Sequence, residues 1–359
     1  MSNVQKYGFL DKLKRTRSLK SLNAFFYKNT RVGQKYFLYN DRLPRVINIS
    51  FNEHTCMYQC RFCRMHKPET RDMYRHKQEM SWETLKNLVR NIPNDSYYSF
   101  DMSSIGETLE FENLPDFIAY MKREKPLVNT IISTNGLLLT PEKMKALVKS
   151  GLDNMQLSLF AANKDDYEWI CKGKQYETVC ENIRKAVEIR NNMNSRTPHM
   201  QVFIAGINEF KDKFKDFVDY WSGIVDVAFV RPINNSFINE EISQIFETNP
   251  YRYPCISPWY STSIRSNGDV LACQVIHFYD SAHKIGNINE KSLEEIWNGK
   301  EKQEWRQRHL EKRWHEMPYC RNCNVWDAYT NIWDWNGKQF QMTIKWTDFF
   351  KKSASYRGA

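Results

Sequence analysis

Residues 56–63 carry the sequence CMYQCRFC, which places three cysteines within eight residues, directly after the β-branched run at 46–51. Three thiolates at CxxxCxxC spacing can hold one face of an iron-sulfur cubane and leave its fourth iron open for a reagent. The alternative is a structural zinc site in which His54 or His66 supplies the fourth ligand. In both cases the predicted metal ligands are Cys56, Cys60 and Cys63.

The stretch around this loop, from residue 45 to residue 231, alternates short β-branched and aromatic runs with longer amphipathic segments. This pattern is typical of consecutive βα units around a parallel sheet. Six strands are expected, at 46–51, 97–103, 129–134, 154–160, 200–205 and 225–230. Helices are expected at 81–92, 112–124, 141–150, 174–192 and 210–222. The predicted fold class is α/β, a partial (β/α)6 TIM-like barrel, in which chemistry belongs at the carboxyl ends of the strands.

Distinct short motifs stand near the ends of three of these strands. The second strand is followed by SIGET at 104–108, the third ends in STNG at 133–136, and the fourth contains QLSL at 156–159. Together with the cysteine triplet, and with Phe62 before its third cysteine, these motifs resemble those of the radical S-adenosylmethionine (SAM) superfamily over nearly the whole chain. One turn departs from the family pattern GGEP, because Ile105 replaces a glycine and Thr108 replaces the proline.

The resemblance implies a set of cofactors and contacts. The open iron of a 4Fe-4S cluster would chelate the methionine part of SAM, and an electron from a flavodoxin or ferredoxin-type reductant would release a 5′-deoxyadenosyl radical. The residues implied to contact SAM are Phe62 at the adenine, Gly106 and Glu107 at the methionine ammonium, Ser133 and Asn135 at the ribose, and Ser158 at the carboxylate or ribose. Each also has an ordinary structural explanation, as a turn former, a solvated acid or a core hydroxyl.

A second set of cysteines, with the spacing Cx17Cx46CxxC, lies beyond the predicted barrel and comprises Cys255, Cys273, Cys320 and Cys323. Four thiolates saturate one cubane, although they would equally saturate a tetrahedral zinc ion. A hairpin is expected from 259–265 and 269–275, joined by Asn267-Gly268, and a short helix from 292–298.

This C-terminal segment resembles the shortened SPASM module, often called a Twitch domain. Because no cysteine follows Cys323, one auxiliary cluster is predicted, giving two 4Fe-4S clusters in all. The two remaining thiols, Cys171 and Cys180, are interpreted as ordinary semi-buried cysteines.

The 359 residues carry a net charge of +10, and this charge is concentrated at the N-terminus. Residues 1–45 contain eleven Lys and Arg against two Asp, a net charge of +9, so the remaining chain is nearly neutral. A basic amphipathic helix is expected at 7–28; it fits an anionic membrane surface as well as it fits a helix that caps the barrel. Nucleic-acid binding is not expected, because the remaining chain adds almost no positive charge. No apolar run is long enough to span a bilayer, and no secretory signal is recognised, so a cytoplasmic protein is predicted, with peripheral membrane contact as the alternative.

Three functional hypotheses follow. The first is a radical SAM oxidoreductase that dehydrogenates a sugar, a polyol or a phosphorylated small molecule and passes an electron to the auxiliary cluster. The second is a radical SAM/SPASM enzyme that modifies ribosomally made peptides, and the third is a zinc-binding scaffold without redox activity. The oxidation needs a proton acceptor, for which Arg231, Lys172 and Lys174 are weak candidates by topology; a surface or phosphate-binding role fits each of them equally well.

The predicted organisation has four parts. Residues 1–44 form a basic extension, and 45–235 form the radical SAM partial barrel. Residues 250–330 form a small α+β auxiliary-cluster domain. Residues 331–359 form an aromatic segment that packs back on the body.

Overall fold

The computed structural model describes residues 26–38, 42–53, 56–65, 78–95, 98–231, 252–278 and 283–328, without positions 28, 64 and 104. It also describes residues 233 and 242 and three short strands, β12 (Asp334–Trp335), β13 (Phe340–Gln341) and β14 (Lys352–Ser353). The predicted basic helix at 7–28, apart from residues 26 and 27, lies outside the described residues. So does most of the aromatic segment at 331–359.

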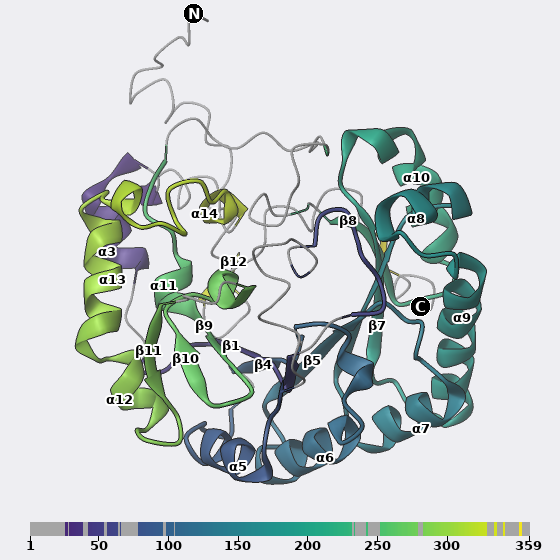
Figure 1. The fold of residues 1–359 in the computed structure, drawn as a ribbon, viewed down its shortest axis with the longest axis horizontal. Helices are drawn as coiled ribbons and strands as arrows, with labels where there is room; N and C mark the ends of the chain where they lie inside the picture. Colours follow the sequence, from purple (N-terminus) through teal and green to yellow (C-terminus); the bar gives the residue numbers. More distant parts are fainter. Residues whose placement is uncertain are drawn as a thin grey trace, which may run out of the picture.

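Six parallel strands form a curved sheet (Figure 1). They pair in chain order: β1 (Val46–Ile49), β4 (Ser99–Asp101), β5 (Asn129–Thr134), β6 (Asn154–Phe160), β7 (His199–Ala205) and β8 (Val227–Arg231). All six predicted strands are present, and the predicted partial TIM-like barrel is confirmed.

The helices that connect these strands lie along the outside of the sheet (Figure 1). Five were predicted: α5 (Trp82–Arg90), α6 (Leu114–Glu124), α7 (Pro141–Lys149), α9 (Tyr176–Asn192) and α10 (Phe214–Trp221). Ser81 and Thr140 cap α5 and α7 by accepting hydrogen bonds from the backbone N–H groups of Thr84 and Lys143. A further helix, α8 (Lys164–Cys171), was not predicted; it begins at Asn163, whose side chain caps it.

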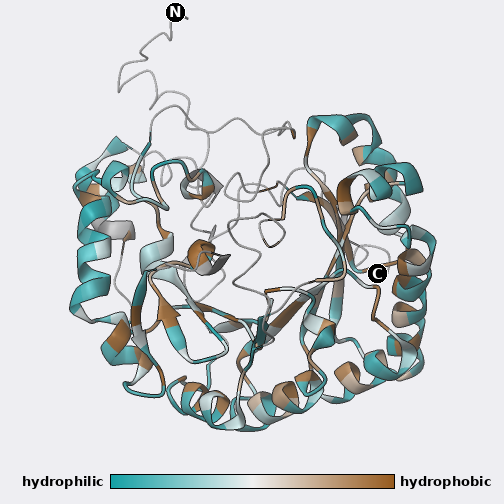
Figure 2. Cartoon of the chain, viewed as in Figure 1, coloured by the Kyte–Doolittle hydropathy of each residue, from teal (hydrophilic) through white to brown (hydrophobic). Residues whose placement is uncertain are grey.

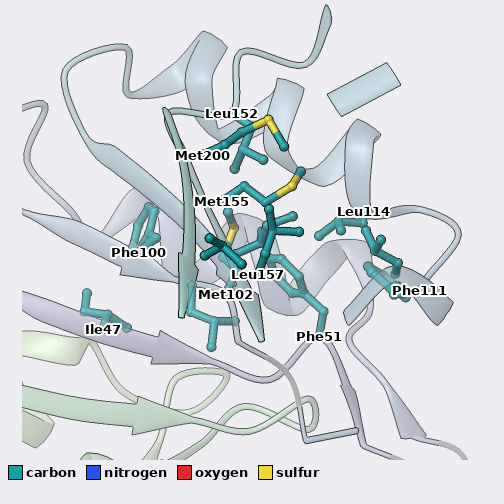
Figure 3. Packing of buried hydrophobic residues seen from close by; sticks show 14 of the residues in the cluster. Ile47, Phe51, Phe100, Met102, Phe111, Leu114, Leu152, Met155, Leu157 and Met200 are labelled. Atoms are coloured by element: carbon teal, nitrogen blue, oxygen red, sulfur yellow. The ribbon is translucent and has the colours of Figure 1, made fainter. Parts of the chain in front are cut away.

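The main core fills the space between the sheet and these helices. Apolar residues of the strands, such as Met155 and Leu157, belong to one buried cluster with helix residues such as Leu114 (Figure 3). Figure 2 shows the corresponding pattern on the helices, with brown apolar faces and teal polar faces. Since side chains alternate along a strand, the residues between them, such as Gln156, face the barrel interior.

The C-terminal segment extends the same sheet. Strand β9 (Ser261–Ile264) runs parallel to β1, and β10 (Asp269–Leu271) and β11 (Lys284–Asn287) follow it in antiparallel order. Gly268 adopts a φ of +88° in the hairpin turn, a conformation that favours glycine. The predicted hairpin arms were too long, because Ser257–Tyr260 form the helical turn α11 and Gln274–Phe278 form the 3-10 helix η6.

Two helices follow the hairpin. The first, α12 (Leu293–Trp297), was predicted and begins with a capping box between Ser292 and Glu295. The second, α13 (Lys300–Leu310), was not predicted. The smaller elements are α3 (Arg31–Phe37), β2 (Asn52–Glu53), β3 (Gln78–Glu79), η3 (Thr108–Glu110), η4 (Asn208–Lys213), η7 (Trp314–Glu316) and α14 (Val325–Ala328). None of the helices in the described part of the chain combines the length and the apolar content that a membrane span requires.

Candidate active site

The loop with the cysteine triplet is fixed against α8, the helix after β6. The backbone N–H of Arg61 donates to Ile170 O at 2.9 Å, and its Nε donates to Trp169 O at 2.6 Å. The Arg61 guanidinium also lies 4.7 Å from the centre of the Trp169 ring. Next to it, the rings of Tyr58 and Tyr167 pack edge to face at 5.8 Å. The loop conformation therefore depends on a helix more than 100 residues further along the chain.

The three thiols of this loop influence one another. Burial is the main cause that raises the pKa of Cys56, and the charges of Glu107, Cys60 and Cys63 raise it further. Burial and the charge of Cys60 raise the pKa of Cys63 to about 12. Thiolates are the form that binds metal, and a bound cationic centre offsets the cost of forming them. This donor set therefore fits an iron-sulfur cluster.

The turns after β4 and β5 are joined through Glu107. This buried carboxylate accepts hydrogen bonds from the backbone N–H groups of Leu109 at 3.0 Å and Asn135 at 2.9 Å, and from the hydroxyl of Thr134. Gly106 and Gly136 take φ values of +103° and +81°, conformations that favour glycine. Glu107 thus holds the STNG turn in place, and its predicted contact with the methionine ammonium stays a prediction.

Asn135 and Phe62 connect the cysteine loop to the strand ends. The Asn135 side-chain amide lies 3.7 Å from the sulfur of Cys56 and 3.3 Å from the sulfur of Met57. The Phe62 ring packs edge to face with Phe160, at the end of β6, with ring centres 4.8 Å apart. The structure therefore brings Phe62, Glu107 and Asn135 to one end of the barrel with the cysteine triplet.

A chain of polar side chains crosses the barrel interior, and the sequence interpretation included only two of its members. The Ser103 hydroxyl is hydrogen-bonded to Asp101 and, at 2.9 Å, to Ser133. Ser133 donates to Gln156 Oε1 at 3.4 Å, and Arg231 Nη1 donates to the same oxygen at 3.0 Å. We call Asp101, Ser103, Ser133, Gln156 and Arg231 the interior array. Asp101, Ser103 and Gln156 could have been found from their alternate positions on predicted strands, which place them on the inward face.

Aromatic rings form the wall beside the interior array. The rings of Phe160, Phe203 and Phe229 follow one another with centre distances of 5.3 and 5.5 Å. The Arg231 guanidinium lies 4.8 Å from the centre of the Phe203 ring. Burial raises the pKa of Asp101, while the hydrogen bond from Ser103 and the charge of Arg231 lower it in part. The interior thus combines an apolar wall with one carboxyl and one guanidinium group.

The other predicted residues lie in different surroundings. Ser158 is on β6 with the same strand parity as Gln156, so it faces inward, and it is half-buried. Lys172 and Lys174 are exposed on the connection between α8 and α9, and neither is hydrogen-bonded to the interior array in the described part of the chain. Arg231 alone of the three weak candidates for the proton acceptor lies in the array.

The two remaining cysteines are more deeply buried than the sequence interpretation assumed. Cys180 lies on α9 beside Tyr176. Cys171 ends α8, and its thiol is hydrogen-bonded to Cys60, which raises the pKa of Cys60. Cys171 is therefore a neighbour of the cysteine loop.

The four cysteines of the second set, Cys255, Cys273, Cys320 and Cys323, line one common cavity. Backbone N–H groups point at two of the sulfurs, from Val275 to Cys273 and from Val325 to Cys323, each at 3.4 Å. Among the described residues, no three Cys, His, Asp or Glu side chains converge on the position of a single metal ion. Four thiols around a cavity, with N–H groups directed at sulfur, fit a polynuclear iron-sulfur cluster.

Two family models match the chain. The model of the radical SAM superfamily covers residues 54–224, and that of the SPASM iron-sulfur cluster-binding domain covers residues 255–324. The first match contains the cysteine triplet, and the second contains the four cysteines predicted to hold the auxiliary cluster. The family match supersedes the zinc alternative for both sites.

Curated relatives match over part of their length. A probable GTP 3′,8-cyclase of Methanococcus maripaludis is 30% identical over 134 residues, or 37% of this chain and 43% of the relative. The GTP 3′,8-cyclase of Limosilactobacillus fermentum is 27% identical over 199 residues, or 55% of this chain and 57% of the relative. The chain thus spans about half the length of the curated relatives it matches.

Solved structures share the fold. BtrN in complex with AdoMet and 2-DOIA superposes with a TM-score of 0.52 at 18% identity, over 79% of this chain and 94% of that chain. Streptococcus suis SuiB bound to the precursor peptide SuiA gives a TM-score of 0.55 at 14% identity, over 87% of this chain and 77% of SuiB. By its two family matches, the chain is a radical SAM enzyme with a C-terminal SPASM-type domain, and its cofactors are SAM, a SAM-binding 4Fe-4S cluster and an auxiliary 4Fe-4S cluster.

Proposed function

We propose that this enzyme is an oxidoreductase that removes two hydrogens from an alcohol group of a sugar, a polyol or a phosphorylated small molecule. Two features together support the proposal. The interior array places hydroxyl, amide, carboxyl and guanidinium groups at the cysteine-loop end of the barrel, and four cysteines form a second site. Such an array suits a substrate rich in hydroxyl groups. Four thiolates leave no iron vacant for substrate, so electron transfer is the role that remains for the second cluster.

The cofactors supply both electron steps. The SAM-binding cluster, reduced by a flavodoxin or ferredoxin-type protein, would deliver one electron that splits SAM into methionine and a 5′-deoxyadenosyl radical, and the oxidised auxiliary cluster would accept one electron from the substrate. Loss of one hydrogen atom from the carbinol carbon to that radical, followed by loss of a proton and of that electron, would convert the alcohol into a ketone. One SAM and one external electron are consumed, and the auxiliary cluster is reduced by one electron.

The chain's own residues bind the substrate and accept the proton. Asp101 is the carboxyl of the interior array, and burial keeps its pKa above the usual range. A carboxyl with a raised pKa is a better base than an ordinary one once it is ionised. Arg231 and Gln156 hold hydroxyl or phosphate oxygens of the substrate, and the Phe160 and Phe203 rings keep water from the reacting carbon.

The test uses the full chain, loaded anaerobically with both clusters. It is incubated with SAM, a reductant and pools of polyols, sugars and their phosphates, and mass spectrometry follows 5′-deoxyadenosine and substrate mass. A product two hydrogens lighter, formed together with deoxyadenosine, is the expected result. A methylated product or an internally linked peptide would overturn the oxidation while leaving the radical step intact.

Two variants separate the roles of the two cysteine sets. Cys56→Ala should abolish deoxyadenosine formation, whereas Cys320→Ala should still cleave SAM but form no oxidised product. Cys180→Ala, a buried thiol outside both sets, is the matched control and should keep both activities. Full SAM cleavage by Cys56→Ala would show that the radical site lies elsewhere.

The second candidate is modification of a peptide, and the shared fold with SuiB bound to SuiA is the observation that favours it. We therefore include short synthetic peptides among the substrate pools. A peptide product formed in stoichiometry with deoxyadenosine would assign the enzyme to that class instead.

A further inference from the structure

Helix α13 buries cationic side chains where a helix normally buries apolar ones. Lys302, Arg306 and His309 are 0%, 2% and 1% exposed, and their spacing of four and three residues places them on one face. A buried charge is costly unless an opposite charge or suitable hydrogen bonds compensate it. Within the described residues, no acidic side chain forms an ion pair with Lys302 or Arg306. Hydrogen bonds or a neighbouring anion that is not an acidic side chain must therefore compensate these charges.

The hydrogen bonds of the two longer side chains lead toward the second cysteine set. Lys302 Nζ donates to the carbonyl of Ala272 at 2.7 Å, the residue before the ligand Cys273. Arg306 Nε donates to the carbonyl of Pro258 at 3.1 Å, and Pro258 lines the cavity. The buried Nη1 and Nη2 atoms of Arg306 have no hydrogen-bond partner in the described part of the chain. Both cations also pack on the ring of Trp297, at 4.0 and 4.5 Å.

His309 lies in the cavity lining itself. Its Nδ1 accepts a hydrogen bond from the backbone N–H of Cys255 at 3.4 Å, and its Nε2 lies 3.7 Å from the sulfur of Cys320. An imidazole whose Nδ1 accepts carries its hydrogen on Nε2, so His309 donates that hydrogen to the cysteine sulfur. The helix thus provides two buried cations and one donor to sulfur.

The charges of the cavity are complementary to this face. Four thiolates around an iron-sulfur cluster leave it negative overall, and its reduction potential rises with positive charge and with hydrogen bonds to its sulfurs. Burial lowers the pKa of Arg306 to about 10, so its guanidinium remains charged at neutral pH. Burial and the charge of Arg306 lower the pKa of Lys302 well below its usual range, and the charges of Cys273 and Cys255 oppose this shift by favouring the protonated form.

We infer that Lys302, Arg306 and His309 raise the reduction potential of the auxiliary cluster and so make it an electron acceptor. A nearby positive charge stabilises the cluster more after it has gained an electron, because the cluster is then more negative. The three side chains act through the cluster, so they are tuning residues. The need for an acceptor rests on the proposed function, but the electrostatic effect does not depend on it.

The test measures potentials of the cluster-loaded full chain without SAM or substrate, by anaerobic redox titration followed by electron paramagnetic resonance. Lys302→Met removes the charge and keeps the length of the side chain. We expect it to lower the auxiliary potential enough to change the oxidised-to-reduced ratio about tenfold, which for a one-electron couple is about 59 mV. Lys302→Arg should retain most of the wild-type potential.

Two internal controls accompany this comparison. The SAM-binding cluster of the same molecule should keep its potential. Lys300→Met changes a lysine of the same helix whose side chain is 85% exposed, and it should leave both potentials unchanged. An unaltered auxiliary potential in Lys302→Met, with full iron content, would overturn the inference.

If Lys302→Met does not load its auxiliary cluster, Arg306→Gln serves as the second test of the inference. Glutamine keeps an amide donor for the Pro258 carbonyl and removes the charge, so a lower potential is again expected, and a potential equal to wild type would overturn the inference. If the variant shows the lowered potential but the wild-type enzyme oxidises no substrate, the result counts against the proposed function alone.

Discussion

The backbone N–H of Asn135 donates to Oε2 of Glu107 at 2.9 Å, so one hydrogen bond joins the turns that follow β4 and β5. The side chain of the same asparagine reaches the sulfur of Cys56. The position of the first cysteine is therefore linked, through two residues, to a buried carboxylate on the neighbouring turn.

Replacing Glu107 by alanine should destabilise the protein and weaken SAM binding. The change leaves the N–H groups of Leu109 and Asn135 and the hydroxyl of Thr134 without their acceptor, at about 1–3 kcal/mol for each buried donor left unpaired. Urea unfolding and the KM for SAM in deoxyadenosine formation measure the two effects. Glu112→Ala, at an exposed position nearby, is the control; equal losses in both variants would contradict the bracing role of Glu107.

Phe160 adopts a φ of +63°, a left-handed conformation that is unusual for an aromatic residue. Glycine reaches this conformation without the steric cost that other residues bear, so Phe160→Gly should be more stable than Phe160→Ala by about 1 kcal/mol. Both variants lose the ring that packs between Phe62 and Phe203, so both should show weaker coupling of SAM cleavage to product. Chemical unfolding compares the stabilities, and equal stability of the two variants would mean that the backbone there is not constrained.

A methyl group at Gly173 should prevent correct loading of the SAM-binding cluster. A Cβ there would lie 2.2 Å from Tyr58 Cε1, and Tyr58 is a buried residue of the cysteine loop. We expect Gly173→Ala to bind less iron, measured per chain after anaerobic reconstitution. In Gly223→Ala the added Cβ meets its nearest atom at 3.5 Å, so this variant should retain full iron content. Normal iron content in both would contradict the role of the Tyr58 contact.

Asp101 predicts a pH dependence of stability. Because its pKa is raised in the folded protein, its contribution to stability is largest below its unfolded pKa of about 3.9 and declines as pH rises through the folded value. Asp101→Asn lacks this decline, so its stability relative to wild type should increase with pH and then level off. Arg231→Met removes a charge that lowers the pKa of Asp101 in the folded protein. The decline in stability should therefore extend to higher pH in this variant. Unfolding curves at several pH values test this, and a constant difference between Asp101→Asn and wild type would refute it.

The sequence predicted the barrel well because its strands carry a strong and regular pattern. Buried residues alternate with less buried ones in β5 and β6, and capping side chains begin α5 and α7. The two cysteine sets were recognisable from their spacing alone.

Other features could not be predicted because they depend on contacts between residues that are far apart in the sequence. Helix α13 has no apolar stripe, since Lys302, Arg306 and His309 occupy most of its buried face. The members of the interior array are single polar residues, most of them on different strands, and only the curvature of the sheet brings Asp101 and Gln156 into one network with Arg231. Helix α8 is short, and its importance comes from its contact with Arg61 of a distant loop.

The parallel pairing of β9 with β1 has a consequence for how this molecule can be divided. Residues 46–49, which lead into the cysteine loop, pair with residues 261–264, which lie between Cys255 and Cys273 in the sequence. The strand before the first cysteine set is thus joined directly to the strand between Cys255 and Cys273. Chimeras that exchange the C-terminal part between homologues must therefore preserve the pairing of β1 with β9. A truncated chain that ends before β9 would leave the edge of β1 unpaired beside its own cysteine loop.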